Sequence, residues 1–140
     1  MQVILCATRG GEASIRTQER AIALAKERGA RLVFVFALDV AFLDKFVAPH
    51  VHAVDDEIEH MAEFLLALAR DRAEREGIEA EYVVREGTLA DVLVNVARDV
   101  GATLIVLGRP RESHVTTLEY LRHELLPYLE KKTGAEVLLV

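Results

Sequence analysis

Two glycine-bearing turns hold the residues of this chain that are best suited to binding an anion. The first turn follows the apolar run 3–8, and the second follows the apolar run 104–107. A turn that leads from a buried strand into a helix offers backbone N–H groups to a phosphate-sized anion. Arginine binds phosphate or carboxylate through paired hydrogen bonds, so converging arginines here would form a cationic mouth. The arginines concerned are Arg9, Arg109, Arg111 and Arg122.

The same arginines have an alternative role as ordinary surface residues. Glu12, Glu112 and Glu119 lie close to them in the sequence, and exposed ion pairs of this kind are weak and common. In that case the arginines pair with these glutamates and bind no ligand. The sequence leaves both interpretations open.

Two other polar groups suggest chemistry but are better explained by helix starts. Ser113 and His114 invite comparison with hydrolases, but neither an acid partner nor a Gly-x-Ser-x-Gly turn accompanies them. We therefore expect Ser113 or a neighbouring threonine to cap a helix. His50, His52 and His60 stand among acidic residues with spacing that zinc can use. Helix capping explains those acidic residues, and we predict neither a metal site nor catalytic residues.

The charge balance of the chain counts against nucleic acid and membranes as partners. With 17 basic and 23 acidic residues the net charge is −6, whereas both partners require a concentrated basic face. The single cysteine, Cys6, excludes an internal disulfide and lies within an apolar run, as expected for a buried, inert thiol in a reducing compartment. There is no basic leader and no membrane-spanning run. We expect a cytoplasmic protein in which residues 1–140 form a single domain.

The candidate site must be positioned by short strand-like runs that alternate with helical ones along the whole chain. This order predicts an α/β fold: a doubly wound, five-stranded parallel sheet with helices on both faces. The strands are expected at 3–8, 31–38, 78–85, 103–107 and 137–140, and the helices at 12–28, 56–77, 89–100 and 115–132.

Two of the helices carry specific signals. Asp56 and Glu59 have capping-box spacing, so the second helix is predicted to open at Asp56, after an irregular stretch over 41–54. The aromatic residues of this stretch either cover the sheet or belong to a lid or docking patch. Pro127 predicts a kink or break in the last helix. The buried stripe of the second helix is expected to comprise Ile58, Met61, Leu65, Leu68 and Ala69.

The last strand is predicted to lie at a sheet edge without a guarding charge. An open apolar edge strand invites aggregation, and pairing with its copy across a two-fold axis removes the open edge. We therefore expect the chain to form a homodimer through this strand. Its residues are Val137, Leu138, Leu139 and Val140.

Several local sequences follow, in order, the pattern of one known family. The matched segments are 3–11, 36–39, 86–88, 102–108 and 136–140. Residues 3–11 are similar to the family's first strand with its Asp-Gly-Ser turn, and 36–39 to the end of its second strand. Residues 86–88 are similar to its Glu-Gly-Asp/Thr helix entry. Residues 102–108 are similar to its Ala-Asp-Leu-Ile-Val-Met-Gly segment, and 136–140 to its closing Pro-Val-Leu-Val-Val strand. Together they resemble the universal stress protein family over essentially the whole chain. The resemblance implies strand order 3-2-1-4-5 and a homodimer.

The resemblance also implies a nucleotide site, and several of its residues differ here. ATP-binding members carry Gly, two residues, Gly, nine residues and then Gly-Ser or Gly-Thr. Gly108 holds the first place, but Arg111 stands at the second and Leu121-Arg122 at the last, while Arg9 replaces an aspartate that helps to hold the nucleotide. Glycine is needed where backbone N–H groups must come close to phosphate. We therefore predict that this chain does not bind ATP in the usual manner of the family.

These observations predict a small homodimeric stress-response or regulatory binding module with a degenerate nucleotide site, and not an enzyme. The alternative is an adenine-nucleotide binder with slow ATPase activity at an arginine-rich site. The expected ligand is ATP or another phosphate-bearing anion, and an unidentified protein is a further possible partner. The residues expected to form the site are Thr8, Arg9, Gly10, Ala37, Gly108, Arg109, Arg111, Ser113 and Arg122.

Overall fold

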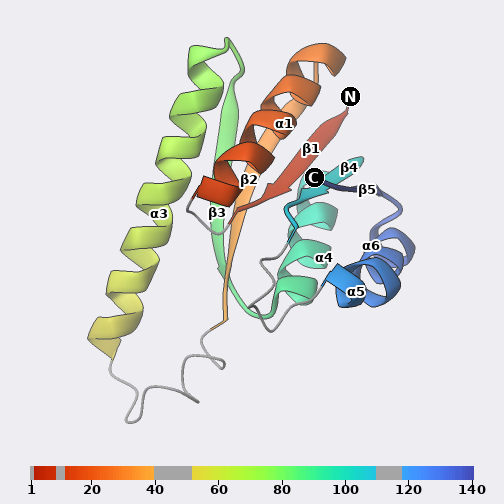
Figure 1. The fold of residues 1–140 in the computed structure, drawn as a ribbon. Helices are drawn as coiled ribbons and strands as arrows, with labels where there is room; N and C mark the ends of the chain where they lie inside the picture. The colour runs from red at the N-terminus through yellow and green to blue at the C-terminus, as the bar shows by residue number, and fades with distance from the viewer. Residues whose placement is uncertain (1, 9–11, 40–51, 110–117) are drawn as a thin grey trace.

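Strands and helices alternate along the chain (Figure 1), in the order that the sequence predicts. The computed structural model describes residues 2–8, 12–39, 52–109 and 118–140, with the side chains of 12–13 and 52–56 left aside. The strands are β1 (Val3–Ala7), β2 (Arg31–Leu38), β3 (Ala80–Glu86), β4 (Leu104–Leu107) and β5 (Glu136–Leu139). The helices are α1 (Glu12–Arg28), α3 (His52–Arg75), α4 (Leu89–Val100), α5 (Leu118–Tyr120), the π-helical η1 (Leu121–Leu125) and α6 (Leu126–Thr133).

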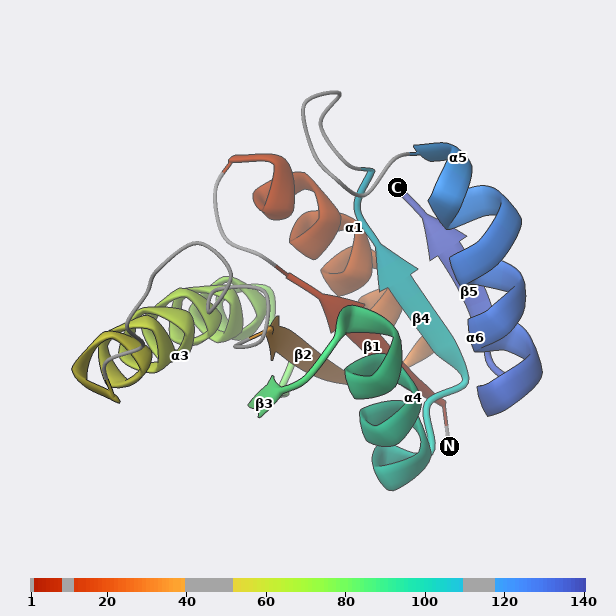
Figure 2. The ribbon, with the colours of Figure 1, turned by 90° about the horizontal axis from the view of Figure 1, so that it is seen from below.

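The sheet has the predicted architecture. Its strands are all parallel and lie in the order β3-β2-β1-β4-β5. Helices α1 and α3 cover one face, and α4 with the α5–η1–α6 segment covers the other (Figure 2). The sequence-based fold class, a doubly wound five-stranded parallel sheet of order 3-2-1-4-5, is confirmed.

The central strands are apolar throughout because both faces of the sheet are covered. Along β1, Ile4 and Cys6 pack toward α1 and α3, whereas Val3 and Leu5 pack toward α4 and α6. All four are buried, as expected of a strand in the middle of a parallel sheet. Continuing this alternation turns the side chain of Thr8 toward α1.

The ends of α4 follow the capping signals of the sequence. Thr88 accepts a hydrogen bond from the Asp91 backbone N–H at its N-terminus, with a donor–acceptor distance of 3.3 Å. Gly101 ends the helix in the left-handed region, with φ of 68°, where a residue with a Cβ is strained. These signals are local, so they can be recognised without knowledge of the tertiary structure.

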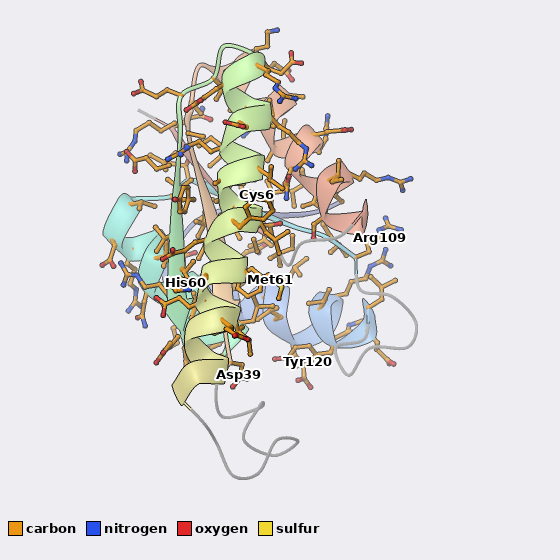
Figure 3. All side chains as sticks on the ribbon, turned by 90° about the vertical axis from the view of Figure 1, so that its left-hand side faces the viewer. Cys6, Asp39, His60, Met61, Arg109 and Tyr120 are labelled. Carbon is orange, nitrogen blue, oxygen red and sulfur yellow. The ribbon has the colours of Figure 1, made fainter. Side chains whose placement is uncertain are left out.

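The prediction for α3 is wrong in two respects. The helix begins at His52 rather than Asp56, so the capping-box residues lie within the helix. Met61 and Leu68 were expected to be buried, but they are 59% and 37% exposed (Met61 is labelled in Figure 3), and Phe64 is 63% exposed. The stripe that faces the sheet is Ala62, Leu66, Ala69 and Ala73.

The small side chains explain this correction. A stripe composed mostly of alanine lets α3 approach the sheet closely. When this stripe is buried, the larger apolar residues lie on the outer side of the helix. Periodicity finds an apolar stripe but does not decide between two stripes that overlap. Of the predicted stripe, Ala69 is buried, while Ile58 and Leu65 are half-buried.

The last helical segment changes its hydrogen-bonding pattern close to Pro127. Pro127 has no N–H to donate to the preceding turn, and the Leu126 N–H bonds to the carbonyl of Leu121, five residues earlier. The segment therefore contains a π-helical turn before α6. The proline thus lies next to a change of helix type rather than a break, because the segment stays helical from Leu118 to Thr133, and Leu121 and Leu125 remain buried on the inward side.

Within the described part of the chain, no helix is both long and apolar enough to cross a membrane.

Candidate functional site

The carboxyl ends of β1 and β4 meet where the strand order reverses. The chain runs from β1 to β2 on one side of this point, and β4 continues to β5 on the other (Figure 2). Cys6 of β1 is in register with Val106 of β4, so Thr8 and Gly108, each two residues further on, reach the same level. In doubly wound sheets, ligands bind in the crevice outside this point. The structure therefore brings together two of the predicted site residues, Thr8 and Gly108.

Thr8 is held at this position by a chain of hydrogen bonds that the sequence analysis did not foresee. Gln18 of α1 donates from Nε2 to the Thr8 Oγ1 over 2.7 Å. Arg72 of α3 donates in turn to the Gln18 Oε1 over 2.9 Å. Thr8 and Gln18 are only 4% and 2% exposed, and the Thr8 backbone N–H bonds to the carbonyl of Val35 on β2 at 3.0 Å. The end of β1 is thus fixed by contacts with α1, α3 and β2.

Gly108 is in close contact with α1. A Cβ added to Gly108 would lie 2.6 Å from the Thr17 Oγ1, where real Cβ contacts essentially never fall below 3.0 Å. Thr17 is itself 3% exposed. The fold therefore requires glycine at position 108 for packing, whatever role its backbone has toward a ligand.

The remaining predicted residues are dispersed or lie outside the described part of the chain. Ala37, on β2, packs toward α4 and α6 and so faces the opposite side of the sheet from Thr8. Arg109 is exposed at the end of β4 (Figure 3), and its backbone N–H bonds to the Val140 carbonyl at 3.2 Å. Arg122 is exposed on η1. The predicted residues Arg9, Gly10, Arg111 and Ser113 lie outside the described residues.

The proposed pairing of the arginines with neighbouring glutamates can be examined only in part. Among the described residues, no ion pair engages Arg109 or Arg122, and Glu119 takes part in none. The side chain of Glu12 and all of Glu112 lie outside the described part of the chain.

Sequence analysis missed Thr17, Gln18 and Arg72, although α1 carries a signal for the first two. Thr17 and Gln18 are spaced at helical intervals from the buried residues Ala21 and Ile22. Two polar side chains at inward-facing positions near the start of a helix must find partners. Arg72 offers no such signal, because it is one of several arginines on α3 and its partner lies 54 residues away.

The other chemically notable groups do not form a site. Cys6 is fully buried, and burial raises the pKa of its thiol from its ordinary 9.0 to about 12, so it stays protonated and inert. Among the described residues, no three His, Cys, Asp or Glu side chains gather as a metal site would require. His60 and Glu57 are exposed on α3, whereas His50 lies outside the described ranges.

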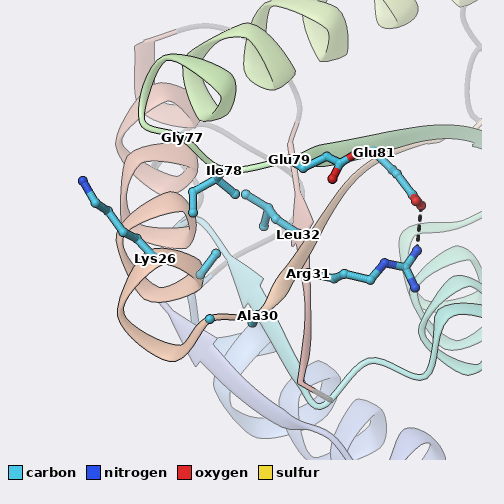
Figure 4. Close-up of a pocket in the computed structure, with 10 residues that line it drawn as sticks. Lys26, Ala30, Arg31, Leu32, Gly77, Ile78, Glu79 and Glu81 are labelled. Atoms are coloured by element: carbon cyan, nitrogen blue, oxygen red, sulfur yellow. Dashed lines mark hydrogen bonds and ion pairs between the residues drawn. The ribbon is translucent and has the colours of Figure 1, made fainter.

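A hollow of about 400 Å³ lies at the opposite end of the sheet (Figure 4). It is formed where α1 and α3 end and where β2 and β3 begin. Arg31 and Glu81 at its rim form an ion pair at 2.8 Å, while Ile78 contributes apolar surface. None of the predicted site residues lines it, and we do not assign it a function.

Comparison with known proteins gives a consistent result. The profile of the universal stress protein family matches residues 1–119. The universal stress protein YxiE of Bacillus subtilis is 27% identical over 113 residues, which span 75% of this chain and 76% of that protein. The structure resembles that of a universal stress protein family member from Burkholderia pseudomallei, with a TM-score of 0.76, 24% identity and coverage of 99% of this chain and 95% of the other.

A second solved structure is of interest for its ligand. It is a universal stress protein in complex with cAMP, with a TM-score of 0.69 and 25% identity to this chain, and the match covers 99% of this chain and 95% of that one.

Proposed function

The chain belongs to the universal stress protein family, and from this premise we propose that it acts in the cytoplasm as a small homodimeric regulatory module. Its crevice binds a phosphate-bearing anion, and it has no enzymatic activity. The anion is held by side-chain donors rather than by the glycine turn that ATP-binding relatives use.

The observation that carries this proposal is the arrangement of Thr8 and Gly108 at the reversal point of the sheet. The Thr8 hydroxyl is a buried polar group at the place where such sheets bind ligands. Arg109 follows Gly108 directly and is exposed, and no ion pair among the described residues engages its guanidinium. A buried hydroxyl at the end of β1 and an exposed guanidinium just after β4, for which the described residues show no ion pair, support a site for an oxyanion.

The packing of Gly108 supports a site that differs from that of ATP-binding relatives. Its α-carbon faces Thr17, so this glycine is explained by the contact between α1 and β4. Arg111 then occupies the second glycine position of the family pattern. A polyphosphate chain wrapped by backbone N–H groups requires glycines at both points, whereas a single phosphate group needs only a few convergent donors.

Calorimetric titration tests this function directly. AMP, ADP, ATP with Mg²⁺ and inorganic phosphate are titrated in parallel into the purified protein. We expect AMP and phosphate to bind, and ATP to bind no more tightly than AMP. The reason is that the chain lacks the second and last glycines of the family pattern, whose backbone N–H groups would contact the outer phosphates. Heat from none of the four ligands would contradict the anion site and leave a dimer that acts without a nucleotide.

Arginine variants identify the binding face. Arg109→Ala and Arg122→Ala are each expected to weaken AMP binding about tenfold, the scale of one charge-assisted hydrogen bond. Arg28→Ala is the matched control, because Arg28 is also exposed but lies at the end of α1, near the opposite end of the sheet. Equal effects from all three variants would indicate general electrostatic attraction rather than a defined site.

The edge strand β5 supports the homodimer. It is the last strand of the sheet, and Val137, Leu138 and Leu139 remain half-exposed. The N–H groups of Glu136 and Val140 bond inward to the carbonyls of Thr103 and Leu107. By strand alternation, the N–H groups of Val137 and Leu139 point away from the sheet. Antiparallel pairing of Val137 with Leu139 of a second copy would satisfy these donors.

A second candidate function is adenine-nucleotide binding with slow ATP hydrolysis. The structural relative solved in complex with cAMP favours an adenine nucleotide in this crevice. Phosphate release from ATP, measured with wild-type protein and with Arg109→Ala, tests this alternative. Release that is proportional to protein concentration and lost in the variant would establish hydrolysis, and release that the variant retains would point to a contaminant.

A further inference from the structure

The hydrogen bonds behind Thr8 have a direction that the chemistry of arginine imposes. The Arg72 guanidinium has donors and no acceptor, so the Gln18 atom that faces it over 2.9 Å must be the oxygen. The Gln18 amide nitrogen therefore faces Thr8, over 2.7 Å. An amide nitrogen only donates, and the Thr8 oxygen must accept this bond.

Because the Thr8 oxygen accepts from Gln18, the Thr8 hydroxyl hydrogen must be donated to a group other than Gln18. A hydroxyl has one hydrogen to donate, and among the described residues no acceptor for that hydrogen is found. Thr8 is 4% exposed and β-branched, so its side chain has little freedom to reorient. A buried donor of this kind is costly unless a partner satisfies it.

We propose that Arg72 and Gln18 are positioning residues that fix the Thr8 hydroxyl as a hydrogen-bond donor at the end of β1, and thereby select an oxyanion as the ligand of the crevice. This inference deepens the proposed function and rests on it. The ligand oxygen is a deprotonated oxygen of a phosphate or a carboxylate, because such an oxygen accepts strong, charge-assisted hydrogen bonds and has no hydrogen to donate.

Gln18→Glu inverts the proposed direction with almost no change of shape. The carboxylate would accept from Arg72 on one oxygen and from the Thr8 hydroxyl on the other. Thr8 would then present only lone pairs to the crevice and would repel an oxyanion. We expect AMP, phosphate and acetate, used as parallel probes in calorimetry, to lose at least about tenfold in affinity for any probe that wild-type protein binds. Binding of phosphate but not acetate would identify the ligand group as a phosphate, and binding of acetate but not phosphate would identify it as a carboxylate.

The added negative charge of Gln18→Glu must be separated from the inversion, and a double-mutant cycle with Thr8→Val does so. Valine has the shape of threonine without its hydroxyl. If Gln18→Glu acts by turning the Thr8 hydroxyl inward, it should cost less than about threefold in affinity once Thr8 is valine. An undiminished loss in the Thr8→Val background would show that charge alone is responsible and would overturn the proposal. Thr8→Ser, which restores a hydroxyl, should regain most of the affinity.

A measurement without ligand keeps the inference testable if no probe binds. The side-chain amide protons of Gln18 are followed by NMR exchange in wild type, Arg72→Met and Arg75→Met. Arg75 is an exposed arginine of the last turn of α3 and serves as the matched control. We expect the exchange rate to rise at least about tenfold in Arg72→Met only. Without the hydrogen bond from Arg72, the Gln18 side-chain amide can rotate and its N–H group no longer stays bonded to Thr8.

The outcomes separate the two proposals. Equal exchange in all three proteins would overturn the fixed direction of the chain, whatever binds. Slow exchange that depends on Arg72, with no binding of any probe by wild type, would support the fixed direction and contradict the anion site. Circular dichroism of each variant confirms that the fold is retained.

Discussion

The contact between Gly108 and Thr17 gives a prediction that also decides why this glycine is present. Gly108→Ala places a Cβ 2.6 Å from the Thr17 Oγ1, and Thr17 is buried at 3% exposure. The hydroxyl cannot retreat into solvent, so α1 or β4 must shift. Overpacking of this kind costs about 2 kcal/mol, which in a domain of this size lowers Tm by roughly 6–8 °C.

The second half of this prediction is a rescue. Thr17→Ala removes the oxygen, and the nearest remaining side-chain atom, the Thr17 Cβ, would lie 3.6 Å from the new methyl group, an ordinary contact. In urea unfolding, Gly108→Ala should therefore cost less than about 0.5 kcal/mol when Thr17 is already alanine. Gly77→Ala is the control, because Gly77 has φ of +78° and nothing within 4 Å of an added Cβ. Its cost should be the same in both backgrounds.

Ligand binding by the same variants completes the test. If Gly108 serves packing, the double variant Thr17→Ala with Gly108→Ala should bind AMP as well as Thr17→Ala alone. Restored stability with lost binding would instead show that the glycine is needed for close approach of the phosphate. A cost of Gly108→Ala that Thr17→Ala leaves unchanged would refute the packing argument itself.

Three further predictions concern other parts of the molecule. Leu139→Lys and, as a second variant, Val137→Pro, whose lost N–H points away from β4, should convert the proposed dimer to monomers in light scattering. A dimer retained by both variants would disprove the proposed β5 interface. Burial raises the pKa of the Cys6 thiol to about 12 in the folded protein, against an ordinary 9.0. Between these two pH values only the unfolded chain loses the thiol proton. The free energy of unfolding should therefore fall above pH 9.0, with a slope approaching about 1.4 kcal/mol per pH unit. This slope should be absent in Cys6→Ala, and its persistence there would assign it to another group. Leu66→Ala should cost about 2–5 kcal/mol in urea unfolding, whereas Phe64→Lys, at a 63% exposed position, should change stability by less than about 0.5 kcal/mol; the opposite order would place the wrong face of α3 against the sheet.

Local signals account for the parts of the fold that were predicted correctly. Thr88 and Gly101 mark the ends of α4 because caps depend only on residues within a turn of the helix. Apolar runs in β2 and β4 mark strands that are buried on both faces. The parallel direction of the strands follows from their alternation with helices, since each helix returns the chain to the same end of the sheet. The strand order 3-2-1-4-5 was expected from the family resemblance.

The start and the buried face of α3 were not predictable in the same way. Asp56 carries a capping signal, yet the helix begins four residues earlier, at His52. The sequence offers two overlapping apolar stripes on this helix, and the structure packs the alanine-rich one on the sheet. Which stripe is buried depends on how α3 fits against the neighbouring elements and not on the residues of α3 alone.

The sequence by itself determined the strands of the sheet, the burial of Cys6 and the two turns proposed as the site, because strand periodicity and helix caps are properties of short segments. Only the tertiary structure decided what surrounds the ends of β1 and β4. It placed Thr17 against Gly108, and it joined Arg72 to Gln18 and Gln18 to Thr8. These partners lie on different elements, up to 91 residues apart for Thr17 and Gly108, and their contacts depend on how α1 and α3 pack on the sheet. The helical spacing of Thr17 and Gln18 from Ala21 and Ile22 indicates that both face inward, but no pattern along the chain identifies the residues that they contact.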